Sequence, residues 1–185
     1  ITIATLGNAS DFGDLITASG YKRGSASLTR GIFAGGWEPS ASATDMEYVT
    51  ISSTGNAFDF GQCTGGQQAS NGCSDSTRGI IGAGGQVPSG PLTQTIEYVT
   101  FSSLGDASAF GDLVRPMFTG AGFGSPTRGI FAGGYVPSPA TTINTIQYIT
   151  ISTLGDAQDF GDLTVIRNNS GGASSTTRGL TIAGG

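Results

Sequence analysis

The chain has 185 residues, of which 37% are hydrophobic and only 11% are charged, and this combination excludes the high-charge, low-hydrophobicity composition of a disordered chain. Its net charge of −5 argues against a nucleic-acid partner, which needs a basic surface. The sequence contains no His, so the commonest general base and metal ligand is missing, and it has no apolar run of the roughly 18 residues needed for membrane insertion.

A unit of about 49 residues recurs nearly four times along the chain. One phrase reads ITIATLGNASDFGDL at 1–15 and recurs at 49–63, 99–113 and 149–163. The other reads TRGIFAGG at 29–36 and recurs at 77–85, 127–134 and 177–185. The repetition predicts a single domain, residues 1–185, in which each unit is one structural module.

Each unit predicts four short strands. The first lies in the looser stretch before each arginine, for example 118–125, and the second is the apolar run that ends in two glycines. The third, at 47–52, alternates apolar and polar residues with a period of two. A Gly-Asn or Gly-Asp turn leads into the short DFGDL strand, which is the fourth. No window has helical periodicity, so the sequence predicts an all-β fold.

Four-stranded antiparallel modules repeated at this period are typical of the blades of a β-propeller. The predicted units are 16–63, 64–113 and 114–163, with a split blade made from 1–15 and 164–185. If four blades close a ring, residues 1–5 pair with residues 179–185. The alternative is that the chain, which starts at Ile1 without Met, is processed or is part of a longer array with more blades.

The repeat resembles the kelch repeat, which has an apolar strand ending in Gly-Gly, then a Tyr, an aromatic and a basic residue. The matching residues are Gly35, Gly36, Tyr48 and Phe60 in one unit, and Gly133, Gly134, Tyr148, Phe160 and Arg167 in another. The chain departs from the kelch pattern where that family usually carries Trp, since it has Phe12, Phe60, Phe110 and Phe160 there. The wording of the whole unit is also similar to kelch-like arrays in virion structural and tail-fibre proteins of marine cyanobacterial phages, and this likeness covers essentially the whole chain.

The resemblance implies a structural protein of the virion, or another extracellular protein, that helps host attachment without catalysis. Its implied partners are other virion or surface proteins, or glycans, and it leaves open an oligomer or a longer chain. The alternative function is that of a secreted or cell-surface propeller that binds carbohydrate as a lectin does. A hydrolase is a distant third, because a propeller scaffold hosts many functions.

The residues offer no catalytic constellation and no cofactor or metal site. Hydrolytic propellers use clustered carboxylates, but Asp11, Asp14, Asp59, Asp159 and Asp162 belong to the recurring DFGDL phrase. We therefore expect these carboxylates at equivalent places in successive units, capping turns or pairing with arginines, rather than converging on one substrate.

The repeated arginines and phenylalanines are predicted to be structural. The residues concerned are Arg30, Arg78, Arg128, Arg178, Phe12, Phe60, Phe110 and Phe160. Each guanidinium has five donors in a fixed fork and is expected to reach a carboxylate or carbonyl group of a neighbouring blade. The alternative is a ring of arginines that binds an anion.

Cys63 and Cys73 occur once, in a single stretch between units, at a spacing that fits neither a zinc pair nor a redox motif. A disulfide between them suits an extracellular setting. Two free thiols are the alternative.

The segments that vary between units indicate where a partner binds. In a propeller, the loops between second and third strands share one face with the connections between blades, and these are the variable segments here. The candidate ligand-binding residues on that face are Trp37, Glu38, Gln86, Tyr135 and Tyr21. Exposed aromatic rings beside polar groups suit stacking on sugars. The alternative is that Trp37 and Tyr135 pack against neighbouring loops or against another chain.

Overall fold

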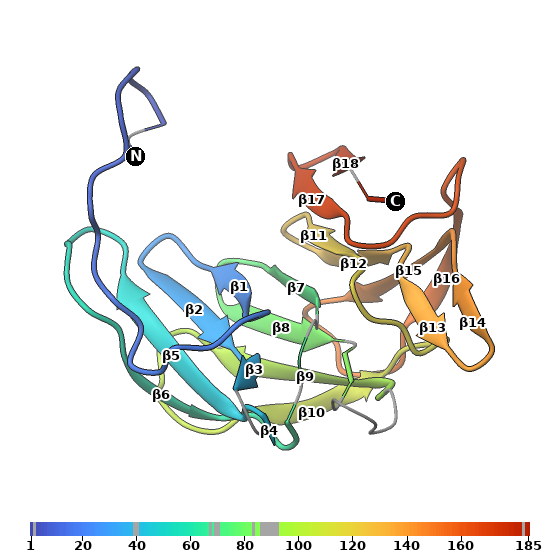
Figure 1. The fold of residues 1–185 in the computed structure, drawn as a ribbon, viewed down its shortest axis with the longest axis horizontal. Helices are drawn as coiled ribbons and strands as arrows, with labels where there is room; N and C mark the ends of the chain where they lie inside the picture. The colour runs from blue at the N-terminus through green and yellow to red at the C-terminus, as the bar shows by residue number, and fades with distance from the viewer. Residues whose placement is uncertain are drawn as a thin grey trace.

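The computed structural model describes residues 1, 3–38, 41–66, 68, 71–82, 84–85, 93–182 and 184–185. These residues form three four-stranded antiparallel sheets and three two-stranded sheets, and none of them lies in an α-helix (Figure 1). The prediction of an all-β fold is therefore confirmed.

The strands follow the repeat along the chain. The first sheet has the order β1 (Arg23–Ala26), β2 (Arg30–Ala34), β5 (Asp45–Thr50) and β6 (Phe58–Gln62). The second has the order β7 (Asn71–Ser74), β8 (Arg78–Gly82), β9 (Thr95–Thr100) and β10 (Ser108–Asp112). The third has the order β11 (Ala121–Gly124), β12 (Arg128–Ala132), β15 (Thr145–Thr150) and β16 (Gln158–Asp162). The small sheets pair β17 (Gly171–Ser174) with β18 (Gly179–Ile182), β3 (Trp37–Glu38) with β4 (Ala41–Ser42), and β13 (Tyr135–Pro137) with β14 (Ala140–Thr142).

Each large sheet is one repeat, because equivalent residues pair in the same register. The arginine that opens the second strand faces the threonine that ends the third, and these pairs are Arg30–Thr50, Arg78–Thr100 and Arg128–Thr150. The three sheets fall within residues 16–63, 64–113 and 114–163. In the described part of the fourth unit, the strands are β17 and β18, which form a hairpin.

The first strands of the four units, β1, β7, β11 and β17, lie side by side and line a common hollow of about 420 Å³. A Cβ atom on Gly72 would lie 2.7 Å from the carbonyl oxygen of Gly24, and one on Gly172 would lie 2.8 Å from that of Gly122. Such distances leave no room for a side chain, so glycine at this position lets the backbones of successive sheets touch.

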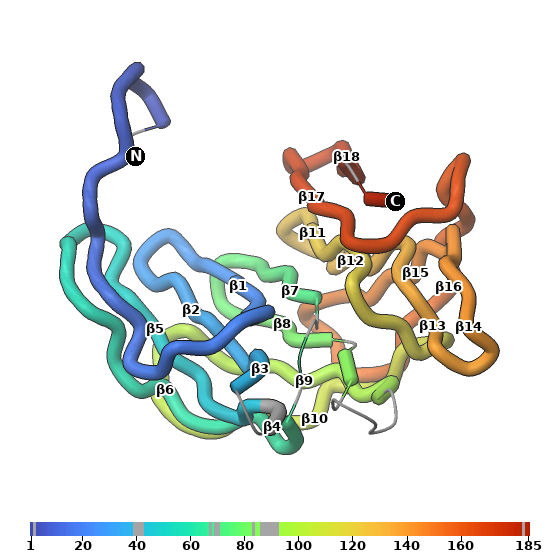
Figure 2. Tube along the Cα trace, in the orientation of Figure 1, coloured from blue at the N-terminus to red at the C-terminus, as the bar shows by residue number. Residues whose placement is uncertain are grey.

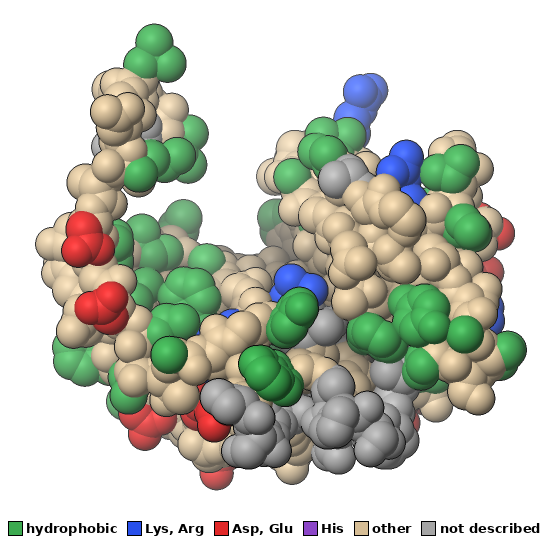
Figure 3. Space-filling model, viewed as in Figure 1, with side chains coloured by type: hydrophobic (Ala, Val, Ile, Leu, Met, Phe, Trp, Pro, Cys, Tyr) green, Lys and Arg blue, Asp and Glu red, His purple; other side chains and the backbone are tan. Residues whose placement is uncertain are grey.

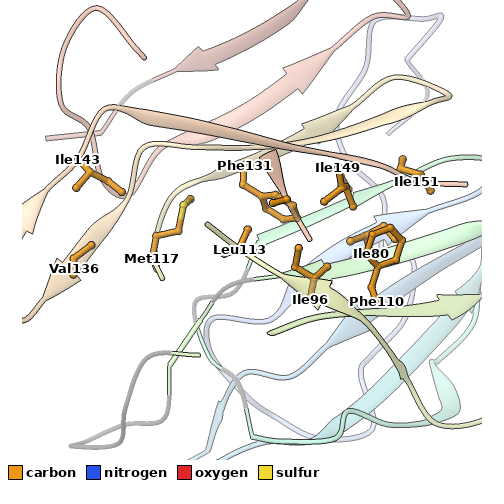
Figure 4. Close-up of a cluster of buried hydrophobic side chains, with 12 residues drawn as sticks. Ile80, Ile96, Phe110, Leu113, Met117, Phe131, Val136, Ile143, Ile149 and Ile151 are labelled. Carbon is orange, nitrogen blue, oxygen red and sulfur yellow. The ribbon is translucent and has the colours of Figure 1, made fainter. Parts of the chain in front are cut away.

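The hydrophobic core lies between neighbouring sheets. Between the second and third sheets it includes Ile80, Ile96, Phe110, Phe131, Ile149 and Ile151 (Figure 4). Between the first and second sheets it includes Ile32, Met46, Phe60, Ile81, Val99 and Phe101. One sheet cannot bury both of its faces alone, so each apolar face depends on the next unit.

The two ends of the chain lie apart, and the sheets form an open arc rather than a closed ring (Figure 2). The expected pairing between residues 1–5 and 179–185 is not formed among the described residues of these segments, because Ile1 and Ile3 are exposed and belong to no strand. A physical sign of the opening is Gly24, where an added Cβ would meet only the Ile32 carbonyl oxygen, at 3.8 Å.

The predicted DFGDL strand at 11–15 is likewise not part of a sheet, because no third strand lies beside it. Its backbone still contacts the next sheet: the amides of Gly55 and Ala57 donate to the carbonyl oxygens of Phe12 (2.7 Å) and Asp14 (2.8 Å). Residues 12–14 thus occupy the place of a fourth strand beside the first sheet.

Candidate functional site

Two hairpins project from the sheets where the second strand leads into the third. The hairpins β3–β4 and β13–β14 each begin directly after a glycine pair with positive φ angles, Gly35–Gly36 and Gly133–Gly134. Gln86, the candidate residue of the second unit, lies outside the described residues.

The connections between sheets lie against these hairpins. Gly20 and Trp37 exchange two backbone hydrogen bonds of 3.0 and 2.7 Å, and Phe118 and Tyr135 exchange two of 3.2 and 2.9 Å. The two kinds of variable segment therefore share one side of the molecule, which we call the hairpin face. It comprises β3–β4, β13–β14 and the connections at residues 16–22 and 114–120.

Trp37 and Tyr21 present aromatic surface to solvent on the hairpin face. Trp37 is 40% exposed and Tyr21 is 62% exposed. Tyr21 has a φ of 58°, in the left-handed region that few residues other than glycine adopt. Thr119 and Asn169, at the equivalent positions of later units, have φ values of 60° and 50°. The turn is thus a feature of the repeat, whereas the aromatic side chain on it belongs to the first unit.

Tyr135 is placed differently. Its ring packs edge-to-face on Phe118, with centroids 5.4 Å apart, and it is only partly exposed. Glu38 is half-buried. No ring contact among the described residues joins Tyr135 to Trp37 or Tyr21. The structure therefore assigns Tyr135 a packing contact, and Trp37 and Tyr21 are the two exposed aromatic candidates on the described part of the hairpin face.

A buried ion cluster lies beneath these aromatic residues, and sequence reasoning did not find it. The ammonium of Lys22, the only lysine, lies 2.9 Å from an Asp45 oxygen and 3.3 Å from a Glu47 oxygen. Burial opposes ionisation of Asp45, but its hydrogen bond to Lys22 and the charge of Lys22 outweigh burial and hold the pKa of Asp45 below its usual value. The cluster fixes Lys22, next to Tyr21, in one position.

Glu47 has a second role. Its carboxylate also accepts hydrogen bonds from the backbone amides of Ile16 (2.8 Å) and Thr17 (3.3 Å) in the preceding connection. In the next two units, Glu97 accepts a hydrogen bond from the backbone amide of Thr64 (2.9 Å), and Gln147 accepts one from the backbone amide of Arg115 (2.9 Å). The sequence pattern that could have indicated this shared role is the recurrence of Glu47, Glu97 and Gln147 at a spacing of 50 residues.

The repeated arginines lie at the other end of the strands, away from the hairpin face. Arg78 donates to the carbonyl oxygen of Ile151 in the next sheet at 2.8 Å, and Arg30 donates likewise to Phe101. Each guanidinium also stacks on a tyrosine of its own sheet, and these pairs are Arg30–Tyr48, Arg78–Tyr98 and Arg128–Tyr148. Of the two expected kinds of acceptor, carboxylate and carbonyl, Arg30 and Arg78 use carbonyl groups.

The repeated phenylalanines pack on the same tyrosines. The edge-to-face pairs are Tyr48–Phe60, Tyr98–Phe110 and Tyr148–Phe160, with centroids 6.0, 6.1 and 5.8 Å apart. Phe60 and Phe110 are buried, whereas Phe12 and Phe160 at the two ends of the arc are partly exposed. Arg178, in the last unit, is exposed.

The carboxylates of the DFGDL phrase do not converge. One of them, Asp159, accepts a local hydrogen bond of 3.2 Å from the backbone amide of Gly161. In the preceding Gly-Asn and Gly-Asp turns, Asn56, Asp106 and Asp156 each accept a backbone hydrogen bond of 2.9 to 3.0 Å from the neighbouring unit. Among the described residues, no group of three or more His, Cys, Asp or Glu side chains could hold a metal ion.

Cys63 and Cys73 are free and buried. Burial raises the pKa of each thiol to about 12, and the charge of Glu97 adds to the shift at Cys63. Neither thiol is a reactive nucleophile near neutral pH. No helix in the described part of the chain is long and apolar enough to cross a membrane.

No protein-family model and no curated protein matches this chain. The geometry of the site is that of a repeated scaffold with arginines at one end of its strands and variable hairpins at the other. The hairpin face carries two exposed aromatic side chains over a fixed ion cluster.

Proposed function

We propose that the chain is a kelch-like β-propeller that serves as a non-enzymatic recognition module, with the hairpin face as its binding surface. The propeller arrangement is supported by three equivalent sheets and a fourth hairpin whose first strands surround one hollow. The open arc favours the alternative of a longer array with more blades over a closed four-bladed ring.

The observation that carries the binding proposal is the contrast between the two ends of the strands. Arg30 and Arg78 each donate a hydrogen bond to a backbone carbonyl group of the next sheet, so the arginine end of the strands holds the sheets together. At the other end, Trp37 and Tyr21 remain exposed although the backbone around them is held by hydrogen bonds. Aromatic residues on a rigid frame lose little conformational entropy when they bind a partner.

The resemblance to phage virion proteins suggests the biological setting. In that setting the module lies on the particle and its hairpin face attaches to the host surface or to another virion protein. A second candidate, a lectin-like propeller, is favoured by the same pair of exposed rings, because aromatic faces stack on the apolar faces of sugar rings.

The test measures binding of the labelled chain to marine cyanobacterial cells and to an array of purified glycans. Trp37→Ala and Tyr21→Ala should each weaken binding by at least about tenfold, since hot-spot residues contribute most of the binding energy. Their thermal unfolding should stay nearly unchanged. Leu28→Ala, which alters an exposed residue in the turn before Arg30, is the matched control.

Treatment of the cells separates the two candidates. Loss of binding after protease indicates a protein receptor, and loss after periodate indicates a glycan. Full binding by the Trp37→Ala, Tyr21→Ala double variant would refute the assignment of the hairpin face.

A further inference from the structure

An open cavity of about 720 Å³ lies between the third sheet and the hairpin β17–β18. Its apolar lining comes from Ile130, Ile146, Phe160 and Leu163 on one side and Leu180 on the other. Phe160 is 53% exposed here, whereas its equivalents Phe60 and Phe110 are buried. The cavity therefore corresponds to the core between two sheets, but some of the apolar side chains that fill such a core elsewhere in the molecule are absent from it.

The corresponding space between the other sheets is filled by one recurring pattern. Three apolar side chains from the end of the third strand and the following turn enter it from the next unit. They are Val99, Phe101 and Ala107 in the second unit and Ile149, Ile151 and Ala157 in the third, and all six are buried.

The same pattern occurs in residues 1–9, which we call the N-terminal segment. By the repeat, Ile1, Ile3 and Ala9 correspond to Ile149, Ile151 and Ala157. Ile1 is 84% exposed and Ile3 is 97% exposed, and the segment projects from the first sheet with hydrophobic side chains along it (Figure 3). One end of the arc thus exposes the side chains that the cavity at the other end lacks.

The backbone repeats this complementarity. In the second sheet, the carbonyl oxygens of Phe110 and Asp112 accept from the amides of Gly155 and Ala157 at 2.9 and 2.8 Å. The amide of Asp112 donates to the side chain of Asp156 at 3.0 Å. In the third sheet, the carbonyl oxygens of Phe160 and Asp162 and the amide of Asp162 make no such bonds to described residues. The N-terminal segment has Gly7, Asn8 and Ala9 at the positions that correspond to Gly155, Asp156 and Ala157.

An arginine completes the set. Arg78 donates to the carbonyl oxygen of Ile151, whose equivalent in the N-terminal segment is Ile3. Arg128 stacks on Tyr148 and borders the cavity, but its guanidinium donates to no carbonyl group among the described residues. The carbonyl group of a docked Ile3 would supply that acceptor.

We propose that the cavity binds the N-terminal segment of a second copy of this chain, so that copies associate head to tail. Within one chain, closure would bring β1 against β17, yet an added Cβ on Gly24 meets no atom of β17. A second copy is not held at the distance that separates the two ends of one chain. Its β1 stacks on β17 of the first copy in the way that β7 stacks on β1 within a chain. Such a contact joins two different surfaces, so it can add further copies in the same sense. The proposal does not depend on what the hairpin face binds.

The experiment pairs two variants that each add one cysteine to the native two, Asn8→Cys and Asp162→Cys, and the docked arrangement places the two added residues in contact. Mixed under mild oxidation, they should form a disulfide-linked dimer of the two variants. Asp112→Cys with Asp156→Cys in one chain is the matched control, because it occupies the equivalent positions of an interface already present. The native thiols are buried and give little background.

Two outcomes would overturn the proposal. In the first, the disulfide forms within a double variant that carries both Asn8→Cys and Asp162→Cys but not between the two separate variants. In the second, the control pair forms its disulfide and the mixed variants form none. A second measurement is sedimentation of the unmodified chain, which should show species above 18.6 kDa that grow with concentration. Ile3→Asp should weaken this association roughly tenfold or more, because it removes an Ile side chain that becomes buried when the segment docks. Leu28→Asp, a change at another exposed apolar residue, should leave it intact, and equal effects of the two changes would also contradict the proposal.

Discussion

One buried polar position joins each sheet to the connection that precedes it. Glu47, Glu97 and Gln147 are almost fully buried, and each accepts a hydrogen bond from a backbone amide of that connection. A buried carboxylate needs such donors, because an unpaired charge in the core costs several kcal/mol. In the first unit Lys22 adds a positive charge, so the connection at residues 16–22 on the hairpin face is held by both ion pairs and hydrogen bonds.

Asp45→Asn should lower the free energy of unfolding at pH 7 and remove part of its acid dependence. Lys22 holds the pKa of Asp45 below its usual value in the folded state. Such a carboxylate contributes stability above its unfolded pKa of about 3.9, and that contribution is lost as the pH falls through the lower, folded pKa. Urea unfolding from pH 7 to pH 2 should show the two proteins converging at the acid end.

Asp59→Asn is the control, because Asp59 is exposed and makes no ion pair among the described residues. A constant difference between wild type and Asp45→Asn across the whole pH range would contradict the ion-pair account.

The arginine position offers a comparison within the chain. Arg78 has both a carbonyl acceptor in the next sheet and a stacked tyrosine, whereas Arg128 has the stacked tyrosine. Arg78→Ala should lower the free energy of unfolding by about 1–3 kcal/mol, since it leaves the Ile151 carbonyl without its donor. Arg128→Ala should cost about 1 kcal/mol or less, the value of an exposed cation–π contact. Chemical denaturation at low protein concentration measures both, and equal losses would argue against the role of the carbonyl contact.

At the scale of elements, the strands followed from local patterns. The alternation at 47–52 and the apolar runs before the glycine pairs predicted β5 and β2, because side chains that alternate between two faces need a pleated strand. The hairpins β3–β4 and β13–β14 were expected only as loops, since their strands are two or three residues long. Residues 11–15 carry the strand pattern of β16 but form no strand, because a strand requires a neighbour that local sequence does not supply.

The site was less predictable than the fold. Trp37 and Tyr21 were candidates from their residue type and their place in the variable segments, whereas the packing of Tyr135 on Phe118 depends on a connection 17 residues away. The cluster of Lys22, Asp45 and Glu47 could not be predicted from spacing, because burial of a charge is decided by the tertiary contacts around it.

The glycines of the inner strands give a prediction about sheet stacking. Gly72→Ala and Gly122→Ala should each lower stability by about 1–3 kcal/mol, because the added methyl group would collide with backbone atoms of the preceding sheet. Gly24→Ala should be close to neutral in the isolated chain, since the space beside Gly24 is open. Thermal unfolding of the three variants checks this. A loss for Gly24→Ala equal to that for Gly72→Ala would show that β1 packs against β17, either in a closed ring if the loss persists at low protein concentration or in the proposed head-to-tail contact if it appears only at high concentration.

At the scale of the whole molecule, the proposed function separates support from recognition. Contacts that recur in successive units, such as the Arg–Tyr–Phe stack and the capped turns, hold the sheets together. The features that occur in one unit only, such as Tyr21 and the Lys22 cluster, gather on the hairpin face. A repeated frame with one variable side is the usual layout of a binding scaffold.

The most direct test of this separation is amide hydrogen exchange of the chain, alone and bound to marine cyanobacterial cell envelopes. The account predicts slower exchange on binding in peptides that carry residues 16–22 and the β3–β4 hairpin, with smaller changes in β13–β14. The turns before Arg30, Arg78 and Arg128 should exchange at the same rate in both states. Protection confined to those turns would place the binding surface at the arginine end of the strands and contradict the account.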